Sequence, residues 1–194
     1  MRVGLKWELF TPVMVLLEPL RHCWIRKGVA TVDQLYPLAG KRVLEVGAGT
    51  GSLLRELRRY DCSLVAVEPT YFMSRVARRR FPDVEVHEES AAAMPSLPDK
   101  SVDLAVIAAT LHGFRPDFRQ RVYAELTRVT RDAVAVIDYH DNHNPFVAAA
   151  EWFEAGDYFN FVKVVDAELA LVFPRVEKRR VHGHESVYLG WLRA

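Results

Sequence analysis

The chain has 194 residues, of which half are hydrophobic and a quarter are charged, and its formal net charge is +1. This length and composition are typical of one globular domain with a buried core. The near-neutral charge gives no reason to expect nucleic acid as a partner. Cys23 and Cys62 form no CxxC pair and indicate no disulfide framework, so we expect a reducing, cytoplasmic setting.

The N-terminal region contains an apolar run, Leu9–Leu17, that is flanked by glutamates and interrupted by Pro12. The run is too short to span a bilayer, and no small-residue cleavage site follows it. We therefore expect neither a signal peptide nor a membrane span. Residues 1–40 are predicted to form a helical cap of one or two helices, broken near Pro12 and Pro19.

From residue 41 onward, apolar β-rich runs alternate with helical patterns, which is typical of parallel βαβ units. The pattern predicts five strands, at Arg42–Val46, Ser63–Val67, Val84–His87, Val102–Ala108 and Ala133–Ile137. Helices are predicted after a glycine-rich turn, over residues 70–81 and over residues 117–130. The continuous apolar run of the fourth strand indicates a strand that is covered on both faces.

After the fifth strand, residues 144–155 and 157–173 are predicted to form two helices hinged at Gly156. Two closing strands follow, Val176–Val181 and Ser186–Leu192, around the turn "HGHE", and we expect them to pair antiparallel. The predicted fold class is therefore α/β: a three-layer sandwich with a mostly parallel seven-stranded sheet ending in an antiparallel hairpin. We expect a single domain over residues 1–194, with the core at 41–194.

The stretch "VLEVGAGTGSLL" joins the first predicted strand to a helix through Gly47, Gly49 and Gly51. Glycines at this junction allow a tight turn and a close approach of the backbone to a ligand. The spacing GxGxG differs from the dinucleotide fingerprint GxGxxG. A structural turn in another kind of α/β protein is the alternative.

Two acids accompany this turn. Glu68 ends the second strand, about where a carboxylate accepts hydrogen bonds from both ribose hydroxyls, although a solvated acid is the alternative. Glu45, in the first strand, places a negative charge beneath the ligand, which disfavours a pyrophosphate and favours an ammonium or a sulfonium. S-adenosylmethionine carries both cations, together with a ribose and an adenine.

With these features the sequence resembles the class I S-adenosylmethionine-dependent methyltransferases over residues 40–192. "VLEVGAGTG" is similar to the first motif of the family, and "VAVEPTYFM" to its second-strand acid with the adenine-side residues. "EESAAAMPSLPDKSVDLAVIAATLHGF" is similar to the adenine loop and fourth strand, and "AVAVIDYH" to the fifth strand. The resemblance implies a Rossmann-like methyltransferase fold, S-adenosyl-L-methionine as the cofactor and methyl transfer as the reaction.

The resemblance also implies roles for eleven residues around the cofactor. Glu45 would lie near the methionine amino group, Glu68 would hold the ribose hydroxyls, and Thr110 would approach the methionine part. The remaining residues would line the methionine and ribose (Gly47, Ala48, Gly49, Gly51) or meet the adenine (Pro69, Met73, Ser90, Ala91). The family often has Asp where Ser90 stands. For Met73, core packing is an equal alternative.

Residues after the fourth and fifth strands are candidates to act on the acceptor, because ligands enter at the carboxyl ends of parallel strands. They are His112, Tyr139 and His140. Methyl transfer from a sulfonium is an in-line displacement that depends on alignment, and a base is needed only if the nucleophile carries a proton. A histidine suits that role near neutral pH, whereas a hydrogen-bonded loop histidine is the alternative.

The segment "DYHDNHNP" has residue types that can bind metals: Asp138, His140, Asp141 and His143. Asp141-Asn142 superficially resembles the pair in cation-dependent O-methyltransferases, but the matching Asp after the fourth strand is absent, so we expect no metal. In "EWFEAGDYFNF", Glu154 and Asp157 could meet a cationic acceptor. Packing is the favoured interpretation for most of its aromatic residues, with the role of Tyr158 left open.

We expect the acceptor to be a small molecule, with a protein side chain as an alternative, and we expect no nucleic acid and leave the oligomeric state open. A second hypothesis is a non-catalytic S-adenosylmethionine-binding or partner-binding protein of the same fold. A third is a nicotinamide oxidoreductase, which GxGxG together with Glu45 disfavours.

Overall fold

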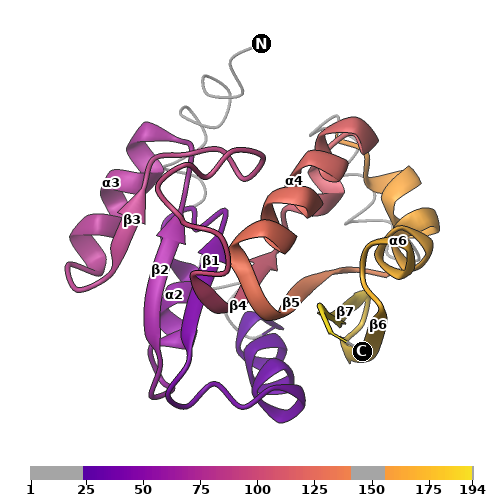
Figure 1. The fold of residues 1–194 in the computed structure, drawn as a ribbon, viewed down its shortest axis with the longest axis horizontal. Coiled ribbons are helices and arrows are strands. Elements are labelled where there is room, and N and C mark those ends of the chain that lie inside the picture. Colours follow the sequence, from indigo (N-terminus) through magenta and orange to yellow (C-terminus); the bar gives the residue numbers. More distant parts are fainter. Residues whose placement is uncertain (1–23, 141–155, 194) are drawn as a thin grey trace.

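Seven strands form one sheet within residues 24–140 and 156–193, the part of the chain that the computed structural model describes (Figure 1). Their order across the sheet is β3-β2-β1-β4-β5-β7-β6. The strands are β1 (Arg42–Val46), β2 (Ser63–Val67), β3 (Glu85–His87), β4 (Val102–Ala108), β5 (Thr130–Tyr139), β6 (Arg175–His182) and β7 (Glu185–Trp191). The predicted bounds of β1, β2 and β4 agree with the structure.

Strands β1 to β6 all run in the same direction, and β7, which lies between β5 and β6, runs in the opposite direction. β1 pairs parallel with β2 and β4, β2 with β3, and β4 with β5. β7 pairs antiparallel with both β5 and β6. Gly183, with a φ of 48°, supplies the left-handed backbone that a tight turn between β6 and β7 requires. The prediction of a mostly parallel sheet ending in an antiparallel hairpin is confirmed.

Helices cover both faces of this sheet and make three layers (Figure 1). α4 (Pro116–Val129) and α6 (Tyr158–Val172) pack on one face, where they meet Val134 and Val136 of β5. A helix over residues 24–35 and α2 (Ser52–Leu57) pack on the other face, against Ala135 and Ile137. α3 (Tyr71–Arg80) joins α2 there. The side chains of β5 alternate between the faces because a strand repeats every two residues.

The structure differs from the predictions at several element ends. β5 extends beyond Ala133–Ile137 because its polar ends are also paired, Thr130 with Val102 of β4 and Asp138 with Ser186 of β7. A short 3₁₀ turn, η1 (Leu111–Gly113), follows β4 and was not predicted. Most of the predicted cap and the predicted helix over 144–155 lie outside the described residues. The division into a cap at 1–40 and a core at 41–194 stays a prediction.

The sheet order places the candidate site. β1 has β2 on one side and β4 on the other, so the connections from β1 diverge at this point. In open α/β sheets, ligands bind in the crevice at the carboxyl ends of the strands on either side of such a point. The glycine turn follows β1, Glu68 follows β2 and η1 follows β4, so all three come to the same edge.

The outer strands of the sheet are unlike the inner ones. β3 has only three residues, and β6, at the opposite end, carries four cationic side chains, those of Arg175, Lys178, Arg179 and Arg180. Among the helices in the described part of the chain, none has the length and apolar character that crossing a membrane would require.

Candidate functional site

The turn after β1 is built on a left-handed backbone. Gly47, Gly49 and Gly51 have φ values of 77°, 55° and 92°, which L side chains rarely adopt. The N–H groups of Gly47 and Ala48 both donate to the carbonyl of Val67, at 2.8 and 3.1 Å, and tie the turn to the end of β2. The sequence GAGTG therefore follows from the shape of this turn.

The three glycines differ in what surrounds them. A β carbon on Gly51 would lie 2.3 Å from Cε2 of Phe81, and one on Gly47 would lie 3.1 Å from Oγ1 of Thr110. A β carbon on Gly49 would meet no atom within 4 Å. Gly51 and Gly47 thus allow close packing within the protein, whereas the backbone at Gly49 borders open space that a ligand could enter.

Glu68 links the turn to the segment before α3. Its Oε2 accepts the N–H of Gly49 at 2.8 Å, and its Oε1 accepts the N–H of Thr70 at 2.8 Å. The side chain is buried. Each carboxylate oxygen can accept more than one hydrogen bond, so both oxygens retain capacity for the hydroxyl groups of a ligand. The carboxylate thus holds the turn and can hold a diol as well.

The Glu45 side chain, on the central strand β1, is buried without a full set of hydrogen bonds. It is 2% exposed, and its buried Oε2 has no hydrogen-bond partner among the described residues. Burial, and then the nearby Glu68 carboxylate, raise the pKa of Glu45 well above its ordinary value, and a backbone hydrogen bond from Leu54 opposes the rise. A cationic ligand group near this carboxyl would satisfy the unpaired oxygen.

We expect Glu45→Gln to stabilise the ligand-free protein, and to do so more at pH 8 than at pH 5. The folded protein keeps a proton on Glu45 above the pH at which the unfolded chain has lost it, so its stability falls as pH rises. The mismatch costs up to about 1.4 kcal/mol per pH unit, and glutamine abolishes it. Urea unfolding at both pH values measures the difference in free energy of unfolding between the two proteins, which should be larger at pH 8 than at pH 5.

Glu88→Gln is the matched control for this experiment, because the Glu88 side chain is 40% exposed, lies 3.8 Å from Arg78 and accepts the Ser74 hydroxyl at 3.4 Å. For this variant, the difference in free energy of unfolding from the unsubstituted protein should be the same at pH 5 and pH 8. An equal effect of Glu45→Gln at pH 5 and pH 8 would contradict the burial argument.

The residues expected around the adenine are arranged in two groups. Pro69 is exposed just after β2, and Met73 is buried on α3. Ser90 and the buried Ala91 lie in a tight turn, in which the Ser90 hydroxyl accepts the N–H of Ala92 at 3.2 Å and the Ser90 carbonyl accepts the N–H of Ala93 at 2.9 Å. The Ser90 hydroxyl therefore holds its own turn, as Asx and Ser/Thr turns do.

On the acceptor side, His112 is paired with Asp138, a residue that the sequence suggested only as a metal ligand. The ring Nδ1 of His112 lies 2.7 Å from Oδ1 of Asp138, and both side chains are buried. Oδ2 of Asp138 accepts the N–H groups of Thr110, Leu111 and His112 at 3.1–3.4 Å, and Oδ1 accepts the N–H of Tyr139 at 2.9 Å. One carboxylate at the end of β5 therefore organises the whole of η1.

The other two candidates lie on either side of this pair. The Tyr139 ring is 4.9 Å from the His112 ring and 5.1 Å from that of Tyr158. His140 instead turns toward β7, where its Nδ1 lies 3.0 Å from the Ser186 hydroxyl. Tyr158 is fully buried, which fits the packing interpretation. Asp141, His143, Trp152 and Glu154 lie outside the described residues, and within those residues no cluster of three or more ligating side chains could hold a metal ion.

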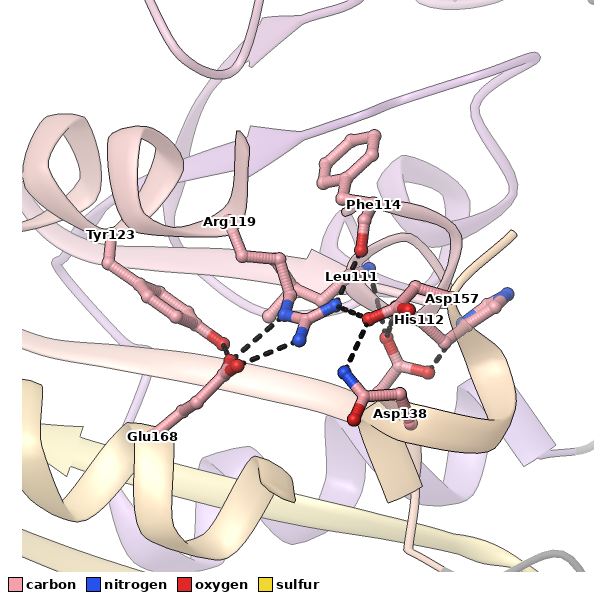
Figure 2. A network of polar contacts seen from close by, with 9 residues as sticks. Leu111, His112, Phe114, Arg119, Tyr123, Asp138, Asp157 and Glu168 are labelled. Atoms are coloured by element: carbon pink, nitrogen blue, oxygen red, sulfur yellow. Dashed lines mark hydrogen bonds and ion pairs between the residues drawn. The ribbon is translucent and has the colours of Figure 1, made fainter. Parts of the chain in front are cut away.

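A buried arginine network, which the sequence did not indicate, lies beneath η1 (Figure 2). Arg119 of α4 is fully buried and binds both oxygens of Glu168 of α6, at 2.9 and 2.7 Å. It also binds Asp157 at 2.7 Å, and the N–H of Asp157 donates to the carbonyl of His112 at 3.1 Å. The expectation that Asp157 meets a cationic acceptor is therefore replaced by a role in holding α6 against η1.

The sequence is similar to those of known methyltransferases. Residues 43–133 match the family described as a methyltransferase domain. Uncharacterised methyltransferases of Mycobacterium tuberculosis and Mycobacterium bovis are 37% identical over 100 residues, covering 52% of this chain and 40% of theirs. A demethylmenaquinone methyltransferase of Renibacterium salmoninarum is 30% identical over 144 residues, covering 74% of this chain and 57% of its own. The chain thus spans 40–57% of the length of these relatives.

A solved S-adenosylmethionine-dependent methyltransferase of Aquifex aeolicus has the same fold, with a TM-score of 0.68 at 20% identity over 94% of this chain and 98% of that chain. The chain carries a class I methyltransferase domain. The matched part of this methyltransferase domain runs from β1 into β5, so it contains the glycine turn, Glu68 and η1. The resemblance seen in the sequence is confirmed.

Proposed function

We propose that the protein is an S-adenosylmethionine-dependent methyltransferase that acts on a small-molecule acceptor. The observation that carries this proposal is the pair of buried carboxyl groups around an open glycine turn. Glu45 has an unpartnered buried oxygen, Glu68 has remaining acceptor capacity, and a side chain on Gly49 would meet nothing. This arrangement fits a ligand with a cation at one end and a diol at the other.

The residues present therefore fit the cofactor that the family implies. Glu45 would hold the ammonium group, and Glu68 would hold the ribose hydroxyls. The remaining residues proposed to line the cofactor are Gly47, Ala48, Gly49, Gly51, Pro69, Met73, Ser90, Ala91 and Thr110. When bound, S-adenosylmethionine supplies a methyl group on a positively charged sulfur, which is already a good leaving group. The chain's task is then to align the acceptor and exclude water.

The acceptor would enter at the carboxyl ends of β4 and β5, beside His112, Tyr139 and His140. A small molecule is favoured because the Renibacterium relative is named for one, demethylmenaquinone. A protein side chain is the alternative acceptor. We place the activity in the cytoplasm, in keeping with Cys62 as a free thiol.

Thermal unfolding with three ligands tests the proposal. S-adenosylmethionine and S-adenosylhomocysteine should each stabilise the protein, by about 2.7 kcal/mol at a ligand concentration 100 times the Kd, whereas NAD should not. In a domain of this size this corresponds to a rise in Tm of roughly 5–10 °C. Stabilisation by NAD alone would overturn the cofactor assignment.

A further inference from the structure

We infer that His112 takes a proton from the methyl acceptor and that Asp138 is the residue that positions it. The inference rests on the proposed function and deepens it by naming the acceptor class. If His112 accepts a proton, then the acceptor carries one on its attacking group, as an alcohol or a phenol does. The inference also distinguishes His112 from the other two candidates after β4 and β5.

The hydrogen bond to Asp138 fixes the form of the His112 ring. Both oxygens of Asp138 already accept backbone N–H groups, four in all, so the side chain faces His112 as a hydrogen-bond acceptor. The Nδ1 atom, 2.7 Å away, therefore carries the ring hydrogen. The lone pair is then on Nε2, the ring nitrogen that points away from the carboxylate (Figure 2). An imidazole held in this form is suited to accept a proton at Nε2.

The pair also lies next to the proposed methyl donor. A β carbon on Gly47 would come within 3.1 Å of the Thr110 hydroxyl, so the start of η1 packs directly on the glycine turn. His112 follows Thr110 by two residues and is fixed to the same Asp138 carboxylate. A base in this turn would border both the cofactor cradle and the entry to the acceptor side of the crevice.

Groups from three elements lie around the His112 ring. From β5 it faces Asp138 and the Tyr139 ring, and from α6 it faces the Tyr158 ring, 6.3 Å away. The Phe161 ring of α6 lies 6.5 Å from the His112 ring, and the guanidinium of Arg119, on α4, is matched by Glu168 and Asp157. Once the ring has accepted a proton, the Asp138 carboxylate in direct contact with Nδ1 stabilises the resulting imidazolium.

The proposed step balances without a further reactant. The proton of the acceptor hydroxyl passes to Nε2 of His112, and the oxygen's electron pair forms the bond to the methyl carbon. The electron pair of the breaking carbon–sulfur bond stays on sulfur, which becomes a neutral thioether. His112 is left as an imidazolium beside Asp138 and returns its proton to solvent when the products leave.

His140 does not share these features. Its ring is held by Ser186 of β7, and its backbone N–H is used by the carbonyl of His184. The Asp138 carboxylate contacts the backbone of Tyr139 and not its hydroxyl. Of the three candidate side chains, the one that Asp138 binds is thus the His112 ring.

Two phenols test the inference, with tritiated S-adenosylmethionine as the donor. Phenol keeps its proton at pH 8, whereas 4-nitrophenol is largely ionised there. We expect His112→Gln to lower kcat toward phenol about 100-fold or more, and toward 4-nitrophenol less than about 10-fold, because only phenol needs the base. Asp138→Asn should lower transfer to phenol and move the acidic limb of its pH profile. Asp166→Asn, on the exposed side of α6, is the control and should leave both unchanged.

Nitrogen NMR of the His112 ring is the second measurement, and it is independent of turnover. Nδ1 should be the protonated nitrogen in the unsubstituted protein, and Asp138→Asn should shift the ring toward the other form. Equal losses toward both phenols, an unprotonated Nδ1, or no transfer to either phenol by a protein that S-adenosylhomocysteine stabilises would each overturn the inference. If neither S-adenosyl ligand stabilises the protein, the proposed function itself has failed.

Discussion

Glu68→Gln is expected to abolish the stabilisation of the protein by S-adenosylmethionine and S-adenosylhomocysteine. Each oxygen of this carboxylate accepts a backbone N–H at 2.8 Å, from Gly49 and from Thr70. Glutamine offers one oxygen and one NH₂ group, so an N–H donor would face another donor. The variant loses both the anchor of the glycine turn and the acceptor for the ribose hydroxyls.

Hydrogen bonds to a charged group are worth about 1.5–3 kcal/mol each, so we expect the Kd for S-adenosylhomocysteine to rise at least about 100-fold. Titration calorimetry measures this change directly. Glu85→Gln changes the same functional group on an exposed residue of β3 and should leave the Kd unchanged. If Glu68→Gln retained an affinity close to that of the original protein, the ribose role of Glu68 would be wrong.

Arg119→Met is expected to lower the free energy of unfolding by about 3–5 kcal/mol, the usual cost of removing one partner of a buried ion pair. The guanidinium is fully buried and binds Glu168 through two nitrogens and Asp157 through a third. Methionine replaces the aliphatic part of the arginine side chain but leaves both carboxylates without their cation. Because Asp157 also binds the carbonyl of His112, η1 should loosen together with α6.

Urea unfolding of two further variants shows whether the loss arises from this network. Arg121→Met removes an exposed arginine from the same helix, where the nearest carboxylate, Asp117, is 3.9 Å away, and should change stability by less than about 0.5 kcal/mol. Adding Glu168→Gln to Arg119→Met should recover part of the loss, because it removes an unpaired charge. Similar losses for Arg119→Met and Arg121→Met would refute the network's role.

Much of the fold could be predicted because the central strands are mainly apolar runs bounded by polar or glycine residues. Those runs gave the limits of Arg42–Val46, Ser63–Val67 and Val102–Ala108. β5 was predicted too short, since Asp138 and Tyr139 are polar and their pairing depends on β7, some 50 residues later in the chain. The hydrophobic pattern of a few neighbouring residues cannot show that a strand so distant in the sequence pairs with them.

The same limit applies to the site. The glycine turn and its acids could be found in the sequence because their spacing reflects a local turn followed by the end of the next strand. The pairing of His112 with Asp138 joins η1 to β5, and that of Arg119 with Glu168 joins two helices. An arginine in an amphipathic helix ordinarily indicates a solvated position, so only the packed structure shows that Arg119 is buried.

The outer strands have a consequence for how the protein behaves in a crowded solution. An exposed strand edge can template pairing with a neighbouring molecule. β3 is too short to serve well as a template, and half of the residues of β6 are arginine or lysine. Two copies of β6 placed edge to edge would bring several charged side chains about 5 Å apart, and burying them between two sheets is unfavourable. This charge pattern guards the molecule against aggregation through its sheet.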